Sequence, residues 1–512
     1  MNKRLLAVTL LVVSMLLIVS AGKAQDATQE AMPAIPPVPT VPLDNPYAAF
    51  IDSRNYAISK GATAEWRKLE WTALDAQNKK VYFAISNLAK GMSDDKGDIQ
   101  MDKVDCGAIM MGELDANMNL ASVTPVIMGG TLDEANKDNS CALDAIAGPD
   151  NLYVDPKGNL WIGEDTDGHK NNVLWMWDAA SKELKRFATV PLGAEVTGLH
   201  ITPDGMLFMN VQHPDDTNTA PFNTGTIGVI KGYVAGDSFE PLAVPTTEAD
   251  MKTVKLAAGE YQILGRIGDA FPGAAADAPV LGAIVAHDKS VLTVCNDPDG
   301  NMFIPSADGK AILYTNIECG VGGVSKLWLE RGTNGDWAAV KGEMVDFIPV
   351  NGTTNNCGAS VTPWGTGMSS EEYPADNEED WQYWVEEQGA GLKALTGKTA
   401  NPFDQGYNVE LVSTDSGTQV IKHYAMGRFS KEVGVVMPDN KTIYFGDDGT
   451  DRVMFKFVAD TAGDLSAGTL YAAKVKQDGD KLNLEWLELG HGKDADIQAG
   501  IRTLDAQFAS GM

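Results

Sequence analysis

A single cysteine stands close to a pair of carboxylates in the stretch NNCGASVTPWGTGMSSEE, residues 355–372. Cys357 is the cysteine, and Glu371 and Glu372 end the stretch. A thiolate is a soft ligand that suits a transition metal, whereas carboxylates are hard ligands that suit ions such as Ca²⁺. The mixture predicts a metal cluster. The alternative for Cys357 alone is a buried or disulfide-bonded thiol.

The chain has five cysteines, Cys106, Cys141, Cys295, Cys319 and Cys357. In an oxidising compartment four of them could pair and one would remain free. Four cysteines allow three pairings, and the sequence does not choose among them. Cys357 is the candidate for the unpaired thiol because of the carboxylates near it.

The first residues are typical of export. A basic start at Lys3 and Arg4 precedes an apolar run over residues 5–20 and small residues up to Ala24. This order predicts a secretory signal peptide over residues 1–24, with an uncleaved membrane anchor as the alternative. We expect a protein that is secreted, periplasmic or on the cell surface, without a stable membrane span after cleavage.

Residues 25–49 are predicted to be a proline-rich linker, because PAIPPVPTVP has too few amide donors for a helix or strand. Residues 50–512 then form one large domain. The formal net charge is -30, with 70 acidic and 40 basic residues. Such a charge argues against nucleic acid or an anionic membrane surface as a partner. It leaves the oligomeric state open.

One short pattern recurs, a Pro-Asp-Gly turn or a relative followed by three or four apolar residues. Its prolines are residues 156, 203, 298 and 438, and a degenerate copy surrounds Ala76. The gaps of 47, 95 and 140 residues are near one, two and three multiples of 47. A four-stranded propeller blade needs roughly 40–50 residues. The spacing predicts an all-β fold, a β-propeller of six blades, while seven or eight stay open.

Two segments do not fit the repeat, residues 235–285 and residues 373–408. We interpret both as loop insertions that cover the mouth of the channel or only decorate the surface. The second could hold a short helix that packs Trp381 and Trp384 on the body.

Four stretches together resemble the PhoX-type alkaline phosphatases, a family of exported six-bladed propellers. They are NNCGASVTPWGTGMSSEE (355–372), GRFSKEVGVVMPDNKTIYFGDDGTDRVMFKF (427–457), AGPDNLYVDPKGNLWIGEDTDG (147–168) and PLGAEVTGLHITPDGMLFMNVQHP (191–214). The family carries Thr-Pro-Trp-Gly-Thr after a cysteine, and Glu-Val-Thr-Gly before Gln-His-Pro. Here Glu195 precedes Cys357, so the order of motifs resembles a circular permutation of the family pattern. A closed ring tolerates this, because it can be opened at another loop.

The resemblance implies hydrolysis of small phosphate esters at a cluster of Fe³⁺ and Ca²⁺. Cys357, Glu432 and Glu195 resemble the ligands of the family's iron pair. Glu371, Glu372, Asp447 and Asp448 are the carboxylates expected to bind calcium. Arg428, Lys431 and His213 are the candidates for phosphate contacts. Cations of this kind would neutralise the oxygens of the ester.

The sequence departs from the family at three points. Lys431 replaces a histidine before Glu432, Gly-Ala-Ser follows Cys357 in place of two glycines, and Lys68-Leu69-Glu70 replaces Arg-Pro-Glu. Two other functions therefore remain in view. One is a calcium-dependent lactonase or esterase, since PDNLYVDPKGNLWI (149–162) also resembles the propellers of that group; it predicts activity unaffected by Cys357→Ala. The other is a secreted calcium-binding propeller without catalysis.

Overall fold

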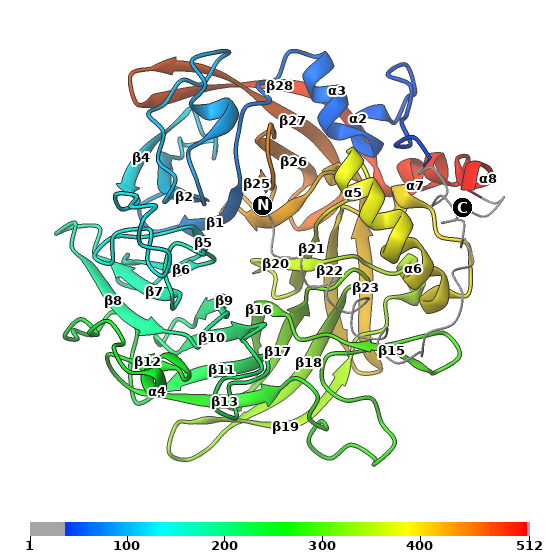
Figure 1. Ribbon diagram of the computed structural model, residues 1–512. Helices are drawn as coiled ribbons and strands as arrows, with labels where there is room; N and C mark the ends of the chain where they lie inside the picture. Colours follow the sequence, from blue (N-terminus) through cyan, green and yellow to red (C-terminus); the bar gives the residue numbers. More distant parts are fainter. Residues whose placement is uncertain (1–35, 307, 509–512) are drawn as a thin grey trace, which may run out of the picture. The chain divides into compact units, whose positions relative to one another are not determined.

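Strands dominate residues 36–306 and 308–508, the part of the chain that this computed structural model describes. They form antiparallel meanders in which a turn separates one apolar strand from the next. The inner strands of successive meanders contact one another, and the last inner strand contacts the first, so the meanders close into a ring (Figure 1). The predicted all-β propeller fold is confirmed.

Within the described ranges, six meanders can be traced around the ring. The first has β1 (Leu69–Asp75), β2 (Lys80–Ile85), β3 (Ala108–Glu113) and β4 (Ser122–Met128). The second has β5 (Pro149–Val154), β6 (Leu160–Glu164), β7 (Val173–Trp177) and β8 (Leu184–Thr189), with β12 (Lys255–Leu256) at its edge. The third has β9 (Glu195–Ile201), β10 (Leu207–Gln212), β11 (Thr226–Lys231) and β13 (Glu260–Arg266).

The other three meanders follow in chain order. The fourth has β16 (Pro298–Pro305), β17 (Lys310–Ile317), β18 (Gly323–Arg331) and β19 (Trp337–Met344). The fifth has β20 (Asn356–Val361), β21 (Gly367–Glu371), β22 (Asn408–Thr414) and β23 (Gly417–His423). The sixth has β24 (Lys431–Val436), β25 (Thr442–Asp447), β26 (Phe455–Thr461), β27 (Asp464–Asp478) and β28 (Lys481–Lys493).

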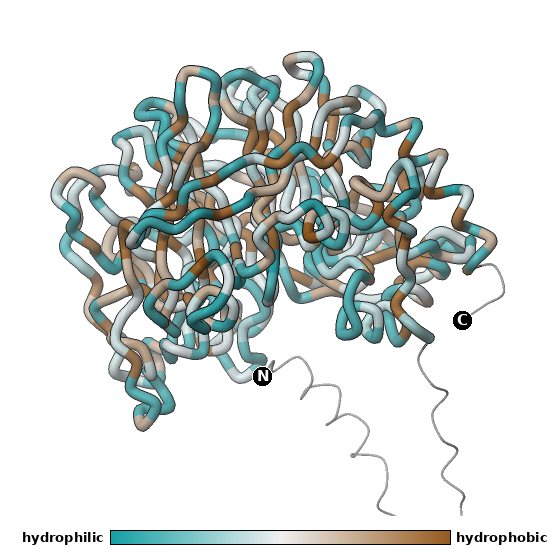
Figure 2. The backbone as a smooth tube through the Cα atoms, turned by 90° about the horizontal axis from the view of Figure 1, so that it is seen from above, coloured by the Kyte–Doolittle hydropathy of each residue, from teal (hydrophilic) through white to brown (hydrophobic). Residues whose placement is uncertain are grey.

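The sixth meander also joins the first through backbone pairing. Leu482 and Asn483 of β28 pair with Val123 and Ser122 of β4, so the two meanders form one nine-stranded sheet. Apolar side chains from neighbouring meanders pack together and form the core; for example, Trp71 of β1 and Trp175 of β7 belong to one buried cluster. In Figure 2 the hydrophobic stretches run through the body, while the outer loops are mostly hydrophilic.

Short helices flank the sixth meander. They are α2 (Ala48–Ile51) and α3 (Ser53–Ser59) before the ring, and α7 (Asp494–Arg502) and α8 (Asp505–Phe508) after it. Packing starts before residue 50, since Val41 and Ala48 are buried in the same cluster as Ile497 of α7. The predicted signal peptide, residues 1–24, lies outside the described residues. Within the described ranges no helix is both long and apolar enough to cross a membrane.

The turn pattern marks the hairpin between the first two strands of a meander in most copies. Ala76, Pro156, Pro203 and Pro438 all lie in such turns. The interpretation of Pro298 as a turn is wrong, because Pro298 begins strand β16 and the hairpin turn comes after Pro305. Pro-Asp-Gly fits a tight turn, but it also fits a strand that opens with a bulge.

The two proposed insertions differ from expectation in extent. Residues 235–285 are only partly an insertion, because β13 is the fourth strand of its meander and β14 (Ala283–Val285) pairs with β15 (Val291–Val294). The region also contains α4 (Glu248–Met251). Residues 373–408 do hold helices, namely α5 (Glu378–Tyr383), the π-helix η3 (Trp384–Gln388), α6 (Gly389–Thr396) and η4 (Pro402–Asp404). Trp381 and Trp384 are buried there and stack at 5.2 Å between ring centroids.

Candidate metal centre

Two positions within the meanders hold the side chains that converge into potential ligand groups. One is the second residue of the inner strand, and the other is the residue that directly follows the second strand. The inner-strand position holds Glu70, Asp150, Asp299, Cys357 and Glu432 in five of the meanders. The other position holds Ser86, Asp165, His213, Glu318, Glu372 and Asp448.

A β-bulge sets the direction of the inner-strand side chains. In the five strands that carry a ligand candidate, the pairing register shifts by one residue between the first and fourth residues of the strand. The candidate is the first of the two residues inside each shift. A bulge bends a strand and re-aims a side chain, which is why bulges are frequent beside functional sites. In β9 the shift comes later, between Thr197 and His200.

Three groups of potential ligand atoms converge at this end of the ring. They are Asp299, Glu318 and Cys357; Cys357, Glu372 and Glu432; and Glu70, Asp150 and Glu432. Within each group the ligand atoms lie within 4.8 Å of one another. Because neighbouring groups share Cys357 or Glu432, they form one continuous cluster, which we call the channel cluster.

The contact between Cys357 and Glu432 is the centre of this arrangement. Cys357 Sγ lies 3.4 Å from Glu432 Oε2, and both residues are buried. Strands β20 and β24 approach closely here, because a Cβ at Gly358 would collide with the carbonyl oxygen of Glu432. Glycine is therefore required directly after the cysteine.

The cluster concentrates negative charge where water is excluded. Burial raises the pKa of the Cys357 thiol well above its usual value, and the charges of Asp299 and Glu432 raise it further. Burial and then the charge of Glu372 raise the pKa of Glu432 in the same way. A cation at the cluster would reverse these shifts, because metal ligands bind in their deprotonated forms and release protons.

The donor set fits bound cations. Among the described residues, Oδ1 of Asp299 and Oε1 of Glu372 are buried and accept no hydrogen bond. A buried carboxylate oxygen without a partner is costly, and coordination of a metal is one way to satisfy it. The group with Cys357 offers sulfur and oxygen, while the group of Glu70 and Asp150 offers oxygen alone.

Glu195 lies beside the cluster and outside the three groups. Its negative charge raises the pKa of both Asp150 and Asp299. Its carboxylate also contacts His213, with Glu195 Oε1 2.5 Å from Nε2, and the other ring nitrogen lies 2.9 Å from the carbonyl oxygen of Gly193. Burial lowers the pKa of His213, but Glu195 outweighs this and raises the pKa to about 10. The contact with Glu195 therefore favours the protonated, cationic form of the ring.

Lys68 borders the cluster beside Glu70. Its Nζ lies 2.7 Å from Oε1 of Glu70 and 3.4 Å from Oδ1 of Asp448. Its side chain is 30% exposed, and that of His213 is 33% exposed. Lys68 and His213 are thus two partly accessible cations at the edge of a buried anionic cluster.

The structure places Glu371 and Asp447 elsewhere, although both were expected to bind calcium. Glu371 pairs with the buried Lys422 at 3.0 Å and accepts the backbone N–H of Tyr407. Asp447 receives two hydrogen bonds from the Arg54 side chain, at 2.9 and 2.7 Å. Both are the last residues of their strands, so their side chains point opposite to those of the residues that follow them.

Arg428 and Lys431 also lie away from the cluster, although both were expected to contact phosphate. Arg428 is buried and donates to the carbonyl oxygens of Gln405 and Pro402. Lys431 Nζ donates to the carbonyl oxygen of Met426 and lies 3.3 Å from the ring centroid of Phe429. Since Glu432 faces the channel, the preceding residue of the strand faces between the sheets.

The Thr-Pro-Trp-Gly-Thr motif is a hairpin turn and not a part of the cluster. It joins Val361 at the end of β20 to Gly367 at the start of β21. Cys357 lies at the other end of β20, about 13 Å away along a strand that rises about 3.3 Å per residue. The motif therefore marks the meander of the cysteine without touching the ligands.

Sequence reasoning missed four members of the cluster, Glu70, Asp150, Asp299 and Glu318. A lone acid is unremarkable in a chain with 70 of them. A usable signal did exist, because Gly148-Pro149-Asp150-Asn151 and Asp297-Pro298-Asp299-Gly300-Asn301 are matching strand openings. The interpretation of the segment around Pro298 as a turn concealed its similarity to the segment around Pro149.

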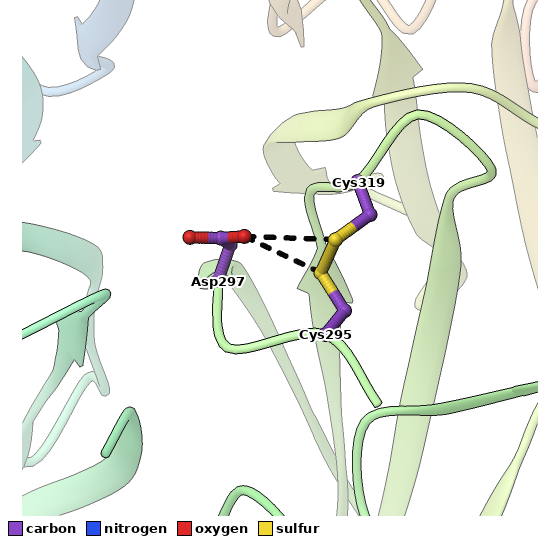
Figure 3. Close-up of side chains that lie close together, drawn as sticks. All are labelled: Cys295, Asp297 and Cys319. Carbon is purple, nitrogen blue, oxygen red and sulfur yellow. Dashed lines mark hydrogen bonds between the residues drawn. A yellow bond between two sulfur atoms is a disulfide. The ribbon is translucent and has the colours of Figure 1, made fainter. Parts of the chain in front are cut away.

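Two disulfides form, Cys106–Cys141 and Cys295–Cys319, and Cys357 is the free cysteine. Asp297 lies close to both sulfurs of the second disulfide (Figure 3). These two sulfurs are bonded to each other, so they are not thiolates and this trio is not a metal site.

Comparisons with known proteins point to one family. The family model described as alkaline phosphatase PhoX matches residues 39–215 and 329–510. Pseudomonas fluorescens PhoX in complex with vanadate is 26% identical over 30% of each chain, with a TM-score of 0.24. The aligned part thus spans under a third of that enzyme.

Two other solved structures align over most of their length at low identity. The Cps50 (Swd1) β-propeller domain of Myceliophteria thermophila is 8% identical over 82% of this chain and 97% of its own, with a TM-score of 0.38. The α-L-arabinofuranosidase Arb93A of Fusarium graminearum is 8% identical over 85% of this chain and 97% of its own, also with a TM-score of 0.38. No curated protein matches the chain.

Proposed function

Because this chain belongs to the alkaline phosphatase PhoX family, we propose that it hydrolyses phosphate monoesters at cations bound by the channel cluster. The observation that carries the proposal is the convergence of one free, buried cysteine and several carboxylates from separate meanders. An isolated buried carboxylate is unstable as an anion, so a whole group of them without cations would oppose folding.

We assign the two kinds of metal by the chemistry of the donors. Cys357, Glu372 and Glu432 would hold iron, because a thiolate among carboxylates suits a transition metal. Glu70 and Asp150 would hold calcium, which prefers oxygen ligands. Bound cations would neutralise charge on the phosphate oxygens.

The chain supplies the contacts that orient an anionic substrate. Lys68 and His213 would face the phosphate, since each is a cation that is partly exposed at the edge of the cluster. Hydrogen bonds from a charged donor to phosphate are the strong kind. Lys431 and Arg428 would instead stabilise the fold beneath the site.

We further propose that the protein works outside the cytoplasm. Its two disulfides are typical of oxidising compartments. A signal peptide over residues 1–24 would provide the route of export.

Release of phosphate from p-nitrophenyl phosphate tests the proposal, with Lys68→Met and Lys431→Met as a matched pair. Loss of the charged contact in Lys68→Met should lower kcat/KM about 10- to 100-fold. The kcat/KM of Lys431→Met should stay within about threefold of wild type, because a methionine fits among the same aromatic rings. No release of phosphate by protein that contains iron and calcium would sink the proposal. Turnover of lactones, unaffected by Cys357→Ala, would instead favour the calcium-dependent lactonase.

A further inference from the structure

The disulfide Cys295–Cys319 brackets two members of the channel cluster. Cys295 comes four residues before Asp299, and Cys319 comes directly after Glu318. In Figure 3 the disulfide joins the segment that enters β16 to the segment that leaves β17. These cysteines fall outside the segments that the family model matches, residues 39–215 and 329–510.

The backbone ladder between β16 and β17 ends beside the bracketed acids, with Asp299 just inside it and Glu318 just outside it. The last pair between β16 and β17 is Pro298 with Ile317, so Glu318 lies one residue beyond it. The N–H of Glu318 donates to the carbonyl oxygen of Asp297 at 2.9 Å. The covalent bond reinforces the two strands at the point where regular pairing stops.

Like charges at this point favour separation of the two strands. Ligand atoms of Asp299, Glu318 and Cys357 lie within 4.8 Å of one another. Carboxylates this close repel each other in a site of low dielectric, so their geometry needs a restraint when no cation neutralises them.

The restraint extends to the loop that carries the free thiol. The carbonyl oxygen of Cys319 accepts the N–H of Asn355 at 2.8 Å, two residues before Cys357. The Asn355 side chain contacts Oε1 of Glu318 at 3.4 Å and accepts a hydrogen bond from Gln388 of η3 at 2.9 Å. Asn355 also has a φ of 38°, an unusual conformation that its contacts must hold in place.

We propose that the Cys295–Cys319 disulfide is a positioning staple for the group of Asp299, Glu318 and Cys357. It holds the three ligands in register for cation binding, and its reduction weakens the cation affinity of the cluster. The inference rests on the proposed function, because it requires that the channel cluster binds cations.

The two disulfides differ in their exposure to reductant. Cys319 is partly exposed, whereas Cys106 and Cys141 are both buried. A disulfide is opened by an attacking thiolate, so access controls the rate. The carboxylate of Asp297 lies 3.4 Å from Cys295 Sγ and 3.5 Å from Cys319 Sγ. Its negative charge repels the thiolate and slows the attack.

The direct test compares Cys295→Ser/Cys319→Ser with Cys106→Ser/Cys141→Ser in the full chain. The second variant is a matched control, because each disulfide closes a loop of similar length, 24 and 35 residues. Elemental analysis gives the metals bound, and a chelator titration gives the rate at which calcium and iron are lost. Removal of the staple should speed that loss about 10- to 100-fold, the usual effect of losing a group that positions metal ligands. In the control variant the rate of metal loss should stay within about threefold of wild type.

A second measurement works on folded wild-type protein and needs no substitution. Dithiothreitol supplies two electrons and two protons to each disulfide it opens and closes to its own cyclic disulfide. Alkylation and mass spectrometry should show Cys295 and Cys319 free before Cys106 and Cys141, with metal lost in parallel. Asp297→Asn should make this reduction faster, because the repelling charge is gone.

The outcomes separate this inference from the proposed function. If wild-type protein binds no cations, the proposed function fails, and the staple fails with it. If wild type binds cations and both disulfide variants release them at the wild-type rate, the staple alone is overturned. Retention of the full metal content after selective reduction of Cys295–Cys319 would overturn it as well.

Discussion

At the scale of single residues, position within a strand separates ligands from structural acids. In Glu371-Glu372 and Asp447-Asp448 the first acid ends a strand and pairs with a buried cation. The second acid follows the strand and faces the channel. Adjacent side chains in extended backbone point to opposite sides, so two acids of the same type have different chemistry.

Glu371→Gln and Glu372→Gln test this separation as a matched pair. Glu371→Gln leaves the buried ammonium of Lys422 without its carboxylate, and we expect it to cost about 3–5 kcal/mol of stability. Glu372→Gln removes charge from a repelling cluster, so the metal-free protein should be at least as stable as wild type while metal content falls. Chemical denaturation and elemental analysis measure the two effects. Equal metal loss in both folded variants would contradict the assignment.

At the scale of elements, the Thr-Pro-Trp-Gly-Thr turn connects the fifth meander to helix α7. Trp364 and Thr366 donate to Oε1 of Glu410, and Oε2 of Glu410 lies 3.0 Å from Nε2 of His423. The other nitrogen of His423 lies 2.9 Å from Asp494, the first residue of α7. The histidine ring thus bridges two carboxylates and holds the helix against the sheet.

This bridge predicts that α7 loosens as pH rises. Burial lowers the pKa of His423, but the hydrogen bonds that its ring donates to Asp494 and Glu410 outweigh it and raise the pKa to about 9. Because the folded pKa exceeds the unfolded value, the stabilisation is complete below about pH 6.5 and is lost as pH rises through about 9. It amounts to about 3 kcal/mol for a shift of this size.

Hydrogen exchange in α7 between pH 6.5 and 9 checks this prediction once the intrinsic pH dependence is subtracted. Protection should fall in wild type and should already be low in His423→Gln. His491→Gln, at an exposed histidine of β28, is the control and should behave as wild type. Protection that stays constant with pH in wild type would show that the bridge is not what holds the helix.

At the scale of the whole molecule, the ring could be predicted from the sequence better than the site. Turns near Pro156, Pro203 and Pro438 recur because each meander needs the same hairpin, and this is a local property. Membership of the cluster is not local. Glu70 and Asp150 meet Glu432 only because the ring closes between β1 and β24, across more than 350 residues of chain.

The register of a strand explains why some candidates lie in the expected motif but do not face the cluster. Lys431 and Glu432 are neighbours in sequence, and only the phase of strand β24 decides which one faces the channel. Which side chain faces the channel depends on where a bulge shifts the register. The bulge in each inner strand depends in turn on pairing with the next strand. Motif resemblance locates the meander, whereas the register selects the side chain.

The central claim is that Cys357 and Glu432 bind a transition metal inside the ring. Anomalous X-ray scattering from crystals of the full chain, collected on both sides of the iron absorption edge, tests it most directly. We predict iron density between the thiolate of Cys357 and the carboxylate of Glu432, with calcium beside Glu70 and Asp150. Crystals of active protein without anomalous density at Cys357, or with iron bound only elsewhere, would contradict the account.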